Sequence, residues 1–355
     1  MSGSSRLDRL LDERGTGQEL GQYVVAAAFD RSAGHAAFAL GDGTVRLVAL
    51  SAGTEWTSVT AHDGVVLALA ADATAGAFLT GGDDGGFRRI DSKGRVSEIA
   101  SFGSKWVEHV ASAAAEGEGR RAKGGYLACA VGRVVHLFDT DDGKLKALEH
   151  PSTVSGLAFD ARGKRIATSH YNGATLWFAA AKEDSPRRLE WKGSHTGVVM
   201  HPDGEAVVTT MQENALHGWR LADGQHMRMS GYQTKVESLS FSRTGKWLAT
   251  GGADVVVLWP FFGGGPMGKP PVELGGGAGE LVTRVACHPQ QDLCAAGFAD
   301  GSVMVAEMVS DRMLPVTGPG RGSVSALAWS SDGATLAFGT DTGFAALIDF
   351  GKQAG

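Results

Sequence analysis

Residues 236–259, VESLSFSRTGKWLATGGADVVVLW, contain the pattern that decides the fold. Three short apolar or alternating runs are separated by two turns rich in Gly, Ser, Thr and Asp. Alternation with a period of two is typical of half-buried strands, and such turns join neighbouring strands into hairpins. The stretch therefore predicts three consecutive antiparallel β-strands.

The same three-strand unit recurs along the chain. We count eight repeat units, whose starts are spaced 39 to 48 residues apart. They start near Val24, Val65, Trp106, Val154, Gly197, Val236, Val282 and Val324. The gaps hold further strand-like segments, such as EWTSVTAH at 55–62 and RRLEWKG at 187–193. Repeats of this length are typical of four-stranded propeller blades.

The repeats predict an all-β propeller of four-stranded antiparallel blades. One such sheet cannot bury both of its faces alone, whereas sheets stacked around a ring bury them against each other. Eight units predict eight blades. The last unit ends at Phe350 after its third strand, so we expect residues 15–22 to supply the missing outer strand and close the ring. Residues 1–14 are then a flexible tail, and residues 15–355 form a single domain.

The third strands resemble those of the WD40-repeat family. Family members read D-G-T-V-R-L-W-D there, and residues 42–48 read DGTVRLV. Elsewhere a hydrophobic–Asp pair replaces the Trp–Asp pair, or the Trp remains without the Asp. The first case occurs at Ile90, Phe138 and Ile348, and the second at Trp177, Trp219 and Trp259. The resemblance covers residues 24–350 and implies a propeller that binds proteins or peptides. Because most family members have seven blades, seven is the alternative number.

The resemblance also implies a buried hydrogen-bonded set of His, Asp, Ser or Thr, and Trp within a blade. Two units hold partial sets. These are His62, Thr80 and Asp84 without the Trp, and Thr250, Asp254 and Trp259 without the His. We therefore expect polar bonding within the blades to be partial, so that apolar packing supplies more of the stability.

The bulk composition argues against several classes of protein. The chain has 355 residues, a net charge of −6 and a pI near 6.0, unlike a basic nucleic-acid binder. Three cysteines do not make a disulfide framework and fit a reducing compartment. We find no apolar run of about 18 residues, as a membrane span requires, and no signal-peptide pattern at the start. We therefore expect a cytoplasmic protein.

Residues 261–271, FFGGGPMGKPP, have the glycine–lysine spacing of a phosphate-binding P-loop. Lys269 completes the spacing, but Pro270 stands where the motif needs Ser or Thr to hold Mg²⁺. No helical period follows, although a P-loop requires a helix N-terminus at the phosphates. We interpret the stretch as a long Gly-Pro loop, which becomes a contact surface only if Phe261 and Phe262 are exposed.

Two other stretches gather residue types that bind metals. CHPQQDLC at 287–294 lacks the second cysteine pair of a zinc site, and its cysteines fall on paired strands, where we expect core residues. The His- and Met-rich residues 211–231 span a turn, a third strand and an outer strand, so their convergence is not implied, and we interpret them as a surface strand of mixed polarity. We predict no metal, no cofactor and no catalytic residues.

The loops that enter first strands and the turns between second and third strands share one face of a propeller, called here the loop face. Binding residues collect on loops held by a rigid scaffold. We place six partner-binding residues there: Lys105, Trp106, His170, Tyr171, Met211 and Lys235. Trp, Tyr and Met beside basic residues are typical of interface hot spots. The sequence thus predicts a non-enzymatic scaffold for a protein or peptide partner, without nucleic acid or membrane.

The competing hypothesis is a propeller enzyme or metal-binding module with its site at the channel mouth. Such a site needs acids and histidines that converge. The first strands offer only Glu108, His109 and Glu237. We expect Glu237 and Arg284 to point toward the channel. Stoichiometric metal in the purified protein would favour this alternative.

Overall fold

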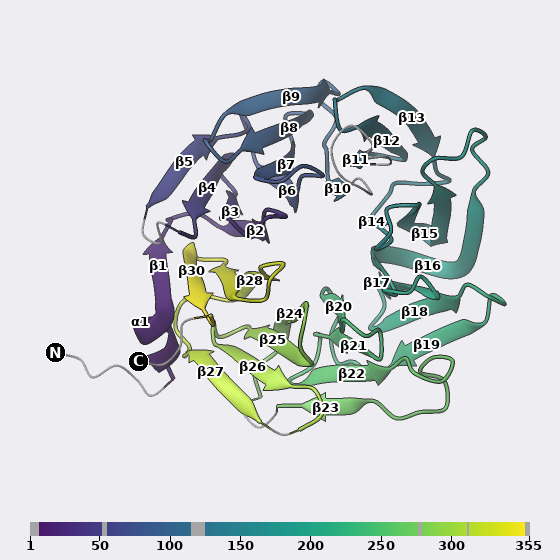
Figure 1. Ribbon diagram of the computed structural model, residues 1–355. Coiled ribbons are helices and arrows are strands. Elements are labelled where there is room, and N and C mark those ends of the chain that lie inside the picture. Colours follow the sequence, from purple (N-terminus) through teal and green to yellow (C-terminus); the bar gives the residue numbers. More distant parts are fainter. Residues whose placement is uncertain (1–6, 52–54, 115–124, 276–278, 311, 352–355) are drawn as a thin grey trace.

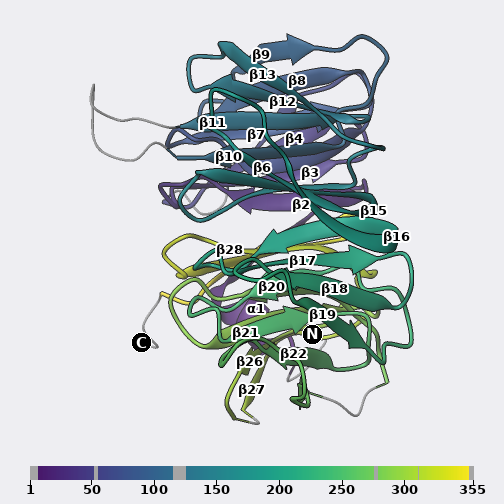
Figure 2. The same ribbon diagram turned by 90° about the vertical axis from the view of Figure 1, so that its right-hand side faces the viewer.

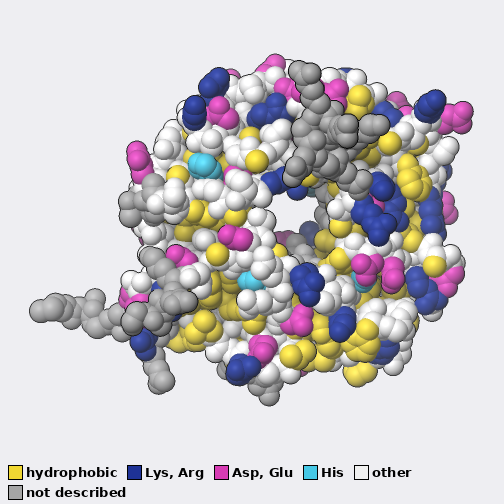
Figure 3. Space-filling model, in the orientation of Figure 1, with side chains coloured by type: hydrophobic (Ala, Val, Ile, Leu, Met, Phe, Trp, Pro, Cys, Tyr) yellow, Lys and Arg dark blue, Asp and Glu magenta, His cyan; other side chains and the backbone are white. Residues whose placement is uncertain are grey.

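The computed structural model describes residues 7–51, 55–114, 125–275, 279–310 and 312–351. These residues form thirty β-strands and one short helix, arranged as a ring of sheets around a central channel (Figure 1). The space-filling view shows the channel open at the middle of the ring (Figure 3). Neighbouring strands pair antiparallel in each sheet. The predicted all-β propeller is confirmed.

Six of the seven sheets have four strands. The first three follow the chain from the inner to the outer strand. They are β2 (Val24–Phe29), β3 (His35–Leu40), β4 (Thr44–Ala49) and β5 (Trp56–Thr60); β6 (Val66–Ala71), β7 (Ala77–Gly82), β8 (Gly86–Asp91) and β9 (Val96–Ser101); and β10 (His109–Ala113), β11 (Tyr126–Val131), β12 (Val134–Asp139) and β13 (Lys144–Glu149).

The other half of the ring has one wider sheet and three further sheets of four strands. The wider sheet contains β14 (Gly156–Phe159), β15 (Arg165–Phe178), β16 (Arg187–Met200), β17 (Ala206–Met211), β18 (Ala215–Arg220) and β19 (His226–Ser230). The others are β20 (Leu239–Phe241), β21 (Trp247–Thr250), β22 (Val256–Pro260) and β23 (Val272–Leu274); β24 (Val282–Cys287), β25 (Leu293–Phe298), β26 (Val303–Glu307) and β27 (Met313–Thr317); and β28 (Val324–Trp329), β29 (Thr335–Thr340), β30 (Phe344–Asp349) and β1 (Gly15–Glu19).

The six-stranded sheet holds both the fourth and the fifth repeat unit. β15 doubles back on itself, so that the residues flanking its two ends meet and Ala179 N donates to Lys164 O. Its turn is made by Asn172 and Gly173, with φ of 66° and 137°. β16 bends at Gly193, with φ of 106°, and passes from the outer strand of one unit into the first strand of the next.

Seven sheets therefore carry the eight repeat units. Tyr171 lies opposite Ser194, and this pair joins the two halves of the six-stranded sheet. With one hydrogen-bonded sheet counted as one blade, the prediction of eight separate blades is wrong and the alternative number of seven is confirmed. The physical reason is that a tight Asn-Gly turn and a glycine bend let β15 and β16 continue as extended chain where other units have loops.

The N-terminal segment closes the ring as predicted. β1 pairs with β30, so that Gly15 lies opposite Ile348 and Glu19 opposite Phe344. Helix α1 (Arg9–Arg14) precedes it and buries Leu11 against the last two sheets. The prediction of a flexible tail is wrong for residues 9–14, which form this docked helix, whereas residues 1–6 lie outside the described residues. The assignment of 15–355 to one domain stays a prediction.

Close packing between neighbouring sheets depends on glycines in second strands. A Cβ on Gly297 would lie 2.3 Å from Val324 Cγ1, and one on Gly339 would lie 2.4 Å from Val24 Cγ1. Both valines are buried at the start of the following unit. Because real Cβ atoms do not approach other atoms this closely, only Gly lets the inner strands stack at this spacing.

Hydrogen bonds also join neighbouring units on the face opposite the loop face, which is the face seen in Figure 3. His201 Nε2 donates to Gly245 O, and His288 Nε2 donates to Gly333 O, each over 3.0 Å. In both cases a backbone N–H nearby donates to Nδ1 of the same ring. These histidines therefore hold adjacent hairpins together and are not available as metal ligands.

Candidate protein-interaction face

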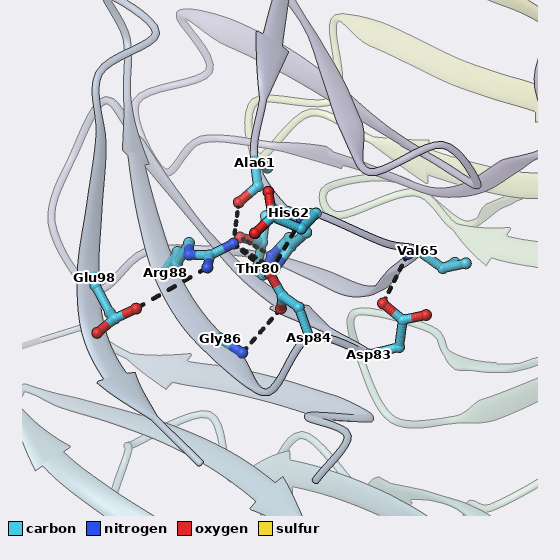
Figure 4. A network of polar contacts seen from close by, with 10 residues as sticks. Ala61, His62, Val65, Thr80, Asp83, Asp84, Gly86, Arg88 and Glu98 are labelled. Atoms are coloured by element: carbon cyan, nitrogen blue, oxygen red, sulfur yellow. Dashed lines mark hydrogen bonds and ion pairs between the residues drawn. The ribbon is translucent and has the colours of Figure 1, made fainter. Parts of the chain in front are cut away.

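The second repeat unit contains a closed polar set between the loop that enters β6 and the β7–β8 hairpin (Figure 4). His62 Nδ1 lies 2.8 Å from Asp84 Oδ1, and His62 Nε2 lies 3.0 Å from Thr80 Oγ1. Arg88 Nη1 donates to the second Asp84 oxygen over 2.7 Å. Arg88 thus adds a cation to the partial set predicted from the sequence, which lacks a Trp because Ile90 occupies that place.

The titrating groups of this set are held in one charge state. Burial lowers the pKa of His62 below its ordinary value. Burial acts to raise the pKa of Asp84, but hydrogen bonds from Gly86 N and His62 outweigh it and hold that pKa well below the usual range. Both ring nitrogens and both carboxylate oxygens have partners inside the chain. The set therefore stabilises the blade and has no group available for acid–base chemistry.

The sixth unit has a set of its own in which Tyr232 takes the place of the absent His. Tyr232 Oη lies 2.6 Å from Thr250 Oγ1 and accepts from Trp259 Nε1 over 2.6 Å. Burial raises the pKa of Tyr232 to about 12, so the hydroxyl stays neutral. Asp254, predicted to belong here, is exposed. Sequence reasoning missed Tyr232, although it precedes Val236 by four residues, as His62 precedes Val66.

The six predicted partner-binding residues divide into three exposed, one half-buried and two buried side chains. Lys105 is exposed, Lys235 is half-buried, and Trp106 and Tyr171 are 56% and 59% exposed. His170 is 4% exposed and Met211 5% exposed. The expectation that these two lie on the surface is wrong.

The buried pair has a local explanation. His170 ends the second strand of its unit, and its Nε2 lies 2.8 Å from Thr175 Oγ1 on the returning arm of β15. Met211 ends β17 opposite His195, and its methyl carbon would be 3.0 Å from a Cβ on Gly193. Both side chains fill space under the turns that they precede.

The loop face presents a further aromatic side chain that the sequence reasoning did not select. Tyr23 stands at the entrance of β2 and is 45% exposed. Trp106 stands at the entrance of the third unit, and Tyr171 in the turn of the fourth. The turns and entry loops of this face lie along the right-hand side of Figure 2. Three exposed aromatic side chains thus share one face of the ring.

A cavity of about 340 Å³ opens at the channel mouth on the same face, and its lining includes Tyr23, Lys235, Glu237 and Arg284. Arg284 Nη1 lies 3.7 Å from Glu237 Oε2, and Lys235 Nζ lies 3.8 Å from Glu237 Oε1. Arg284 Nε also donates to Ser325 O over 2.7 Å. Glu237 and Arg284 therefore lie at the channel mouth as expected, and they neutralise each other there.

The P-loop resemblance is a coincidence of spacing. Lys269 Nζ donates to the carbonyl oxygens of Phe262, Gly263 and Gly265 within its own loop. A phosphate site needs backbone N–H groups in that position, and carbonyl oxygens would repel the anion. Phe261 is buried, whereas Phe262 is exposed with the Lys269 ammonium 4.8 Å from its ring centre.

The other candidate metal ligands are also accounted for by packing and hydrogen bonds. Cys287 lies opposite Cys294 in the β24–β25 pair. The core interpretation is confirmed for Cys294, which is fully buried, and holds only in part for Cys287, which is half-buried. The surface-strand interpretation of the His- and Met-rich stretch is wrong for most of its members, because His217, Met227 and Met229 are buried. His217 Nε2 lies 2.9 Å from His226 Nδ1, and this pair has no third ligand among the described residues. Within the described residues, no three His, Cys, Asp or Glu side chains are placed to hold a metal. The enzyme or metal-binding alternative therefore has no support here.

Known proteins share both the repeats and the fold. Residues 225–259 match the WD domain, G-beta repeat, and residues 285–354 match the Anaphase-promoting complex subunit 4 WD40 domain. With the sheets arranged as a propeller, these matches support a WD40-repeat β-propeller. Propellers of this family are typically protein-interaction scaffolds and are generally non-enzymatic.

Two individual proteins illustrate the likeness. Telomerase protein component 1 of Mus musculus is 25% identical over 205 residues, which are 57% of this chain but 8% of that protein. The crystal structure of the computationally designed Ika8 protein has a TM-score of 0.69 and 18% sequence identity, covering 94% of this chain and 99% of that chain. The second match shows the fold alone. Among the described residues, no helix is long and apolar enough to cross a membrane.

Proposed function

We propose that this protein is a non-enzymatic scaffold that binds a protein partner through its loop face. The observation that carries the proposal is the presence of Tyr23, Trp106 and Tyr171, all about half exposed, at three places on that one face. Exposed aromatic side chains beside basic residues are enriched where proteins bind one another. Lys105 and Lys235 supply the basic residues on this face.

The arrangement of the face also fits a binding surface. Its loops are held by paired strands, so that a partner meets a pre-formed surface and little ordering entropy is lost on binding. The polar sets of the second and sixth units lie directly beneath it and fix the positions of the turns. The loop face therefore has a rigid backbone and presents three separate aromatic side chains, those of Tyr23, Trp106 and Tyr171.

The test is affinity capture from the source cells with the intact protein and a variant carrying Trp106→Ala, Tyr171→Ala and Lys235→Ala. We expect the intact protein to retain a partner that the variant loses. The matched control is Phe178→Ala with Phe262→Ala, because these two exposed rings lie at the ends of third strands, away from the loop face. Equal capture by all three proteins, each folded to the same melting temperature, would exclude the loop face as the binding surface.

A further inference from the structure

A groove opens at the rim of the loop face beside the fourth repeat unit. Its larger part has a volume of about 650 Å³ and is bordered by the loop that enters β14, the turn of β15 and the outer arm of β16. A second hollow of about 280 Å³ adjoins it and shares Pro151 and Arg188 with it. The groove lies at the outer strand of the ring and is separate from the cavity at the channel mouth.

The floor of the groove is closed and its polar atoms are satisfied. His170, Ala174 and Leu189 are buried there. The His170 ring nitrogens contact Tyr171 O over 2.9 Å and Thr175 Oγ1 over 2.8 Å. The floor therefore offers ring and methyl surface without an unpaired donor, which suits an apolar side chain of a ligand.

The walls of the groove are fixed by backbone geometry. A Cβ on Gly173 would lie 2.1 Å from Leu189 O, so only Gly allows the turn to approach the outer arm this closely. Asn172 Oδ1 accepts from Gly193 N over 3.3 Å and ties that turn to the bend of β16. Tyr171 N donates to Ser152 Oγ over 3.0 Å. These bonds fix the backbone of Tyr171 at the edge of the groove, where its ring is exposed.

The charges of the groove are only partly neutralised. Arg133 pairs with Glu149 over 3.5 Å. The ion pairs of the described residues include neither Arg188 nor Lys192, both of which are exposed on the wall. Glu190 lies between them in sequence and is also exposed. The groove thus has a surplus of positive charge on a chain whose net charge is −6.

Size and shape favour a peptide over a small molecule. The two hollows follow one another along the outer arm of β16, whose residues advance about 3.3 Å each, as do those of an extended ligand. Tyr171, Trp191 and Pro151 border the path, and these rigid side chains lose little entropy when they are covered. An extended chain with carboxylates for the two cations and one apolar side chain for the floor matches this surface.

We propose that this groove binds an extended acidic peptide segment of a partner protein, with Arg188 and Lys192 contacting its carboxylates and an apolar side chain seated over Ala174 and Leu189. This rests on the proposed scaffold function and names the partner chemistry at one part of the loop face.

The test begins with selection of random peptides, about twelve residues long so that they exceed the groove, on the full-length protein. We expect the enriched peptides to combine several Asp or Glu with one aromatic or aliphatic residue. The best peptide is then synthesised with a fluorescent label, and its binding is measured by anisotropy. Arg188→Glu with Lys192→Glu should weaken binding about tenfold or more, and added salt should weaken binding to the intact protein.

The matched control is Arg187→Glu, which changes the same charge at the neighbouring position, on the other side of the same strand. It should leave the affinity nearly unchanged. Three results would overturn the proposal. The first is equal weakening of peptide binding by the control variant, and the second is no enrichment of acidic peptides on the intact protein. The third is displacement of the peptide by a single-stranded oligouridylate at equal concentration. Arg188→Ala replaces the double variant if the latter has a lower melting temperature. If no acidic peptide binds but the loop face still captures a partner, the groove proposal alone is overturned. If neither the peptide nor a partner is bound, the scaffold function is overturned as well.

Discussion

The polar set of the second repeat unit and the groove beside the fourth use the same residue types to opposite effect. In the second unit, the turn carries Asp84, which neutralises Arg88 and binds His62. In the fourth unit, the corresponding turn carries Tyr171 and Asn172 and has no carboxylate. Among the described residues, the nearby Arg188 therefore forms no ion pair.

The difference shows that, in one scaffold, some turns hold residues that stabilise the fold and other turns hold residues that are available to a ligand. Where a turn supplies a carboxylate, histidine and arginine are buried or paired and hold the blade together. Where the turn supplies an aromatic ring and an amide, the cation and the ring face solvent. Paired groups contribute to folding, while unpaired surface groups contribute little to it and are available to a ligand.

The largest effect is expected for His62→Ala. The substitution removes two hydrogen bonds and leaves Thr80 and Asp84 partly unsatisfied in a buried site, so the free energy of unfolding should fall by about 3 kcal/mol. Urea denaturation at pH 7 measures this change. Asp63→Ala, in the neighbouring exposed position, should change it by less than about 0.5 kcal/mol. Equally small changes in the free energy of unfolding for His62→Ala and Asp63→Ala would show that the polar set of the second unit does not stabilise the fold.

Mildly acidic pH should lower the free energy of unfolding, because the buried histidines are neutral in the folded protein. Burial lowers the pKa of His150 to about 4 and that of His217 to about 3, against 6.5 in the unfolded chain. The unfolded state therefore binds more protons below pH 6.5, so stability is full above that pH and is lost as the pH falls toward 4. Between pH 7 and 5 the loss should be about 2 to 3 kcal/mol.

Urea midpoints at the two pH values measure this acid effect. The stability of a His150→Gln variant should depend less on pH, because one of the buried neutral imidazoles is gone. Identical midpoints at pH 7 and pH 5 for the unmodified protein would contradict the assignment of these histidines as buried and neutral.

Tyr232→Phe tests whether tyrosine takes the histidine's role in the sixth unit. The ring stays, but Trp259 Nε1 and Thr250 Oγ1 lose their shared partner, so the free energy of unfolding should fall by about 1 to 2 kcal/mol. Tyr171→Phe removes a hydroxyl from an exposed ring and should have no measurable effect on stability. Thermal and urea unfolding of both variants measure these changes. An unchanged free energy of unfolding for Tyr232→Phe would contradict the role of Tyr232 as the replacement for the histidine.

The smallest effect on folding is expected in the groove. Arg188→Ala and Tyr171→Ala truncate exposed side chains without a buried partner, and each should change the free energy of unfolding by less than about 0.5 kcal/mol. The same variants should lose partner binding. A large loss of stability in either would mean that the groove belongs to the structural part of the molecule.

The sequence predicted the ring well because its signal is repeated. Turn chemistry and strand alternation recur eight times, and the missing outer strand of the last unit indicated that β1 would close the ring. The union of the fourth and fifth units could not be read from the repeats. It depends on how Asn172, Gly173 and Gly193 keep two strands continuous, and these residues look like ordinary turn residues in sequence.

The candidate site was only partly predictable for a similar reason. Position in a turn placed Trp106, Tyr171 and Lys235 correctly on the loop face. Whether a strand's last side chain faces solvent depends on its partner across the hairpin, and Thr175 draws His170 inward. Arg188 was overlooked because its significance lies in forming no ion pair among the described residues, although Glu190 and Glu149 line the same groove, and only the folded arrangement shows this.

The most direct measurement is site-specific photocrosslinking in the source cells. A photoreactive phenylalanine is placed at position 171 in one protein and at position 178 in another, since both native rings are more than half exposed and sit at opposite ends of the β15 hairpin. We expect a discrete crosslinked partner from position 171 and none from position 178. Crosslinking from position 178 alone, or equally from both positions, would contradict the loop face as the surface through which this propeller binds its partner.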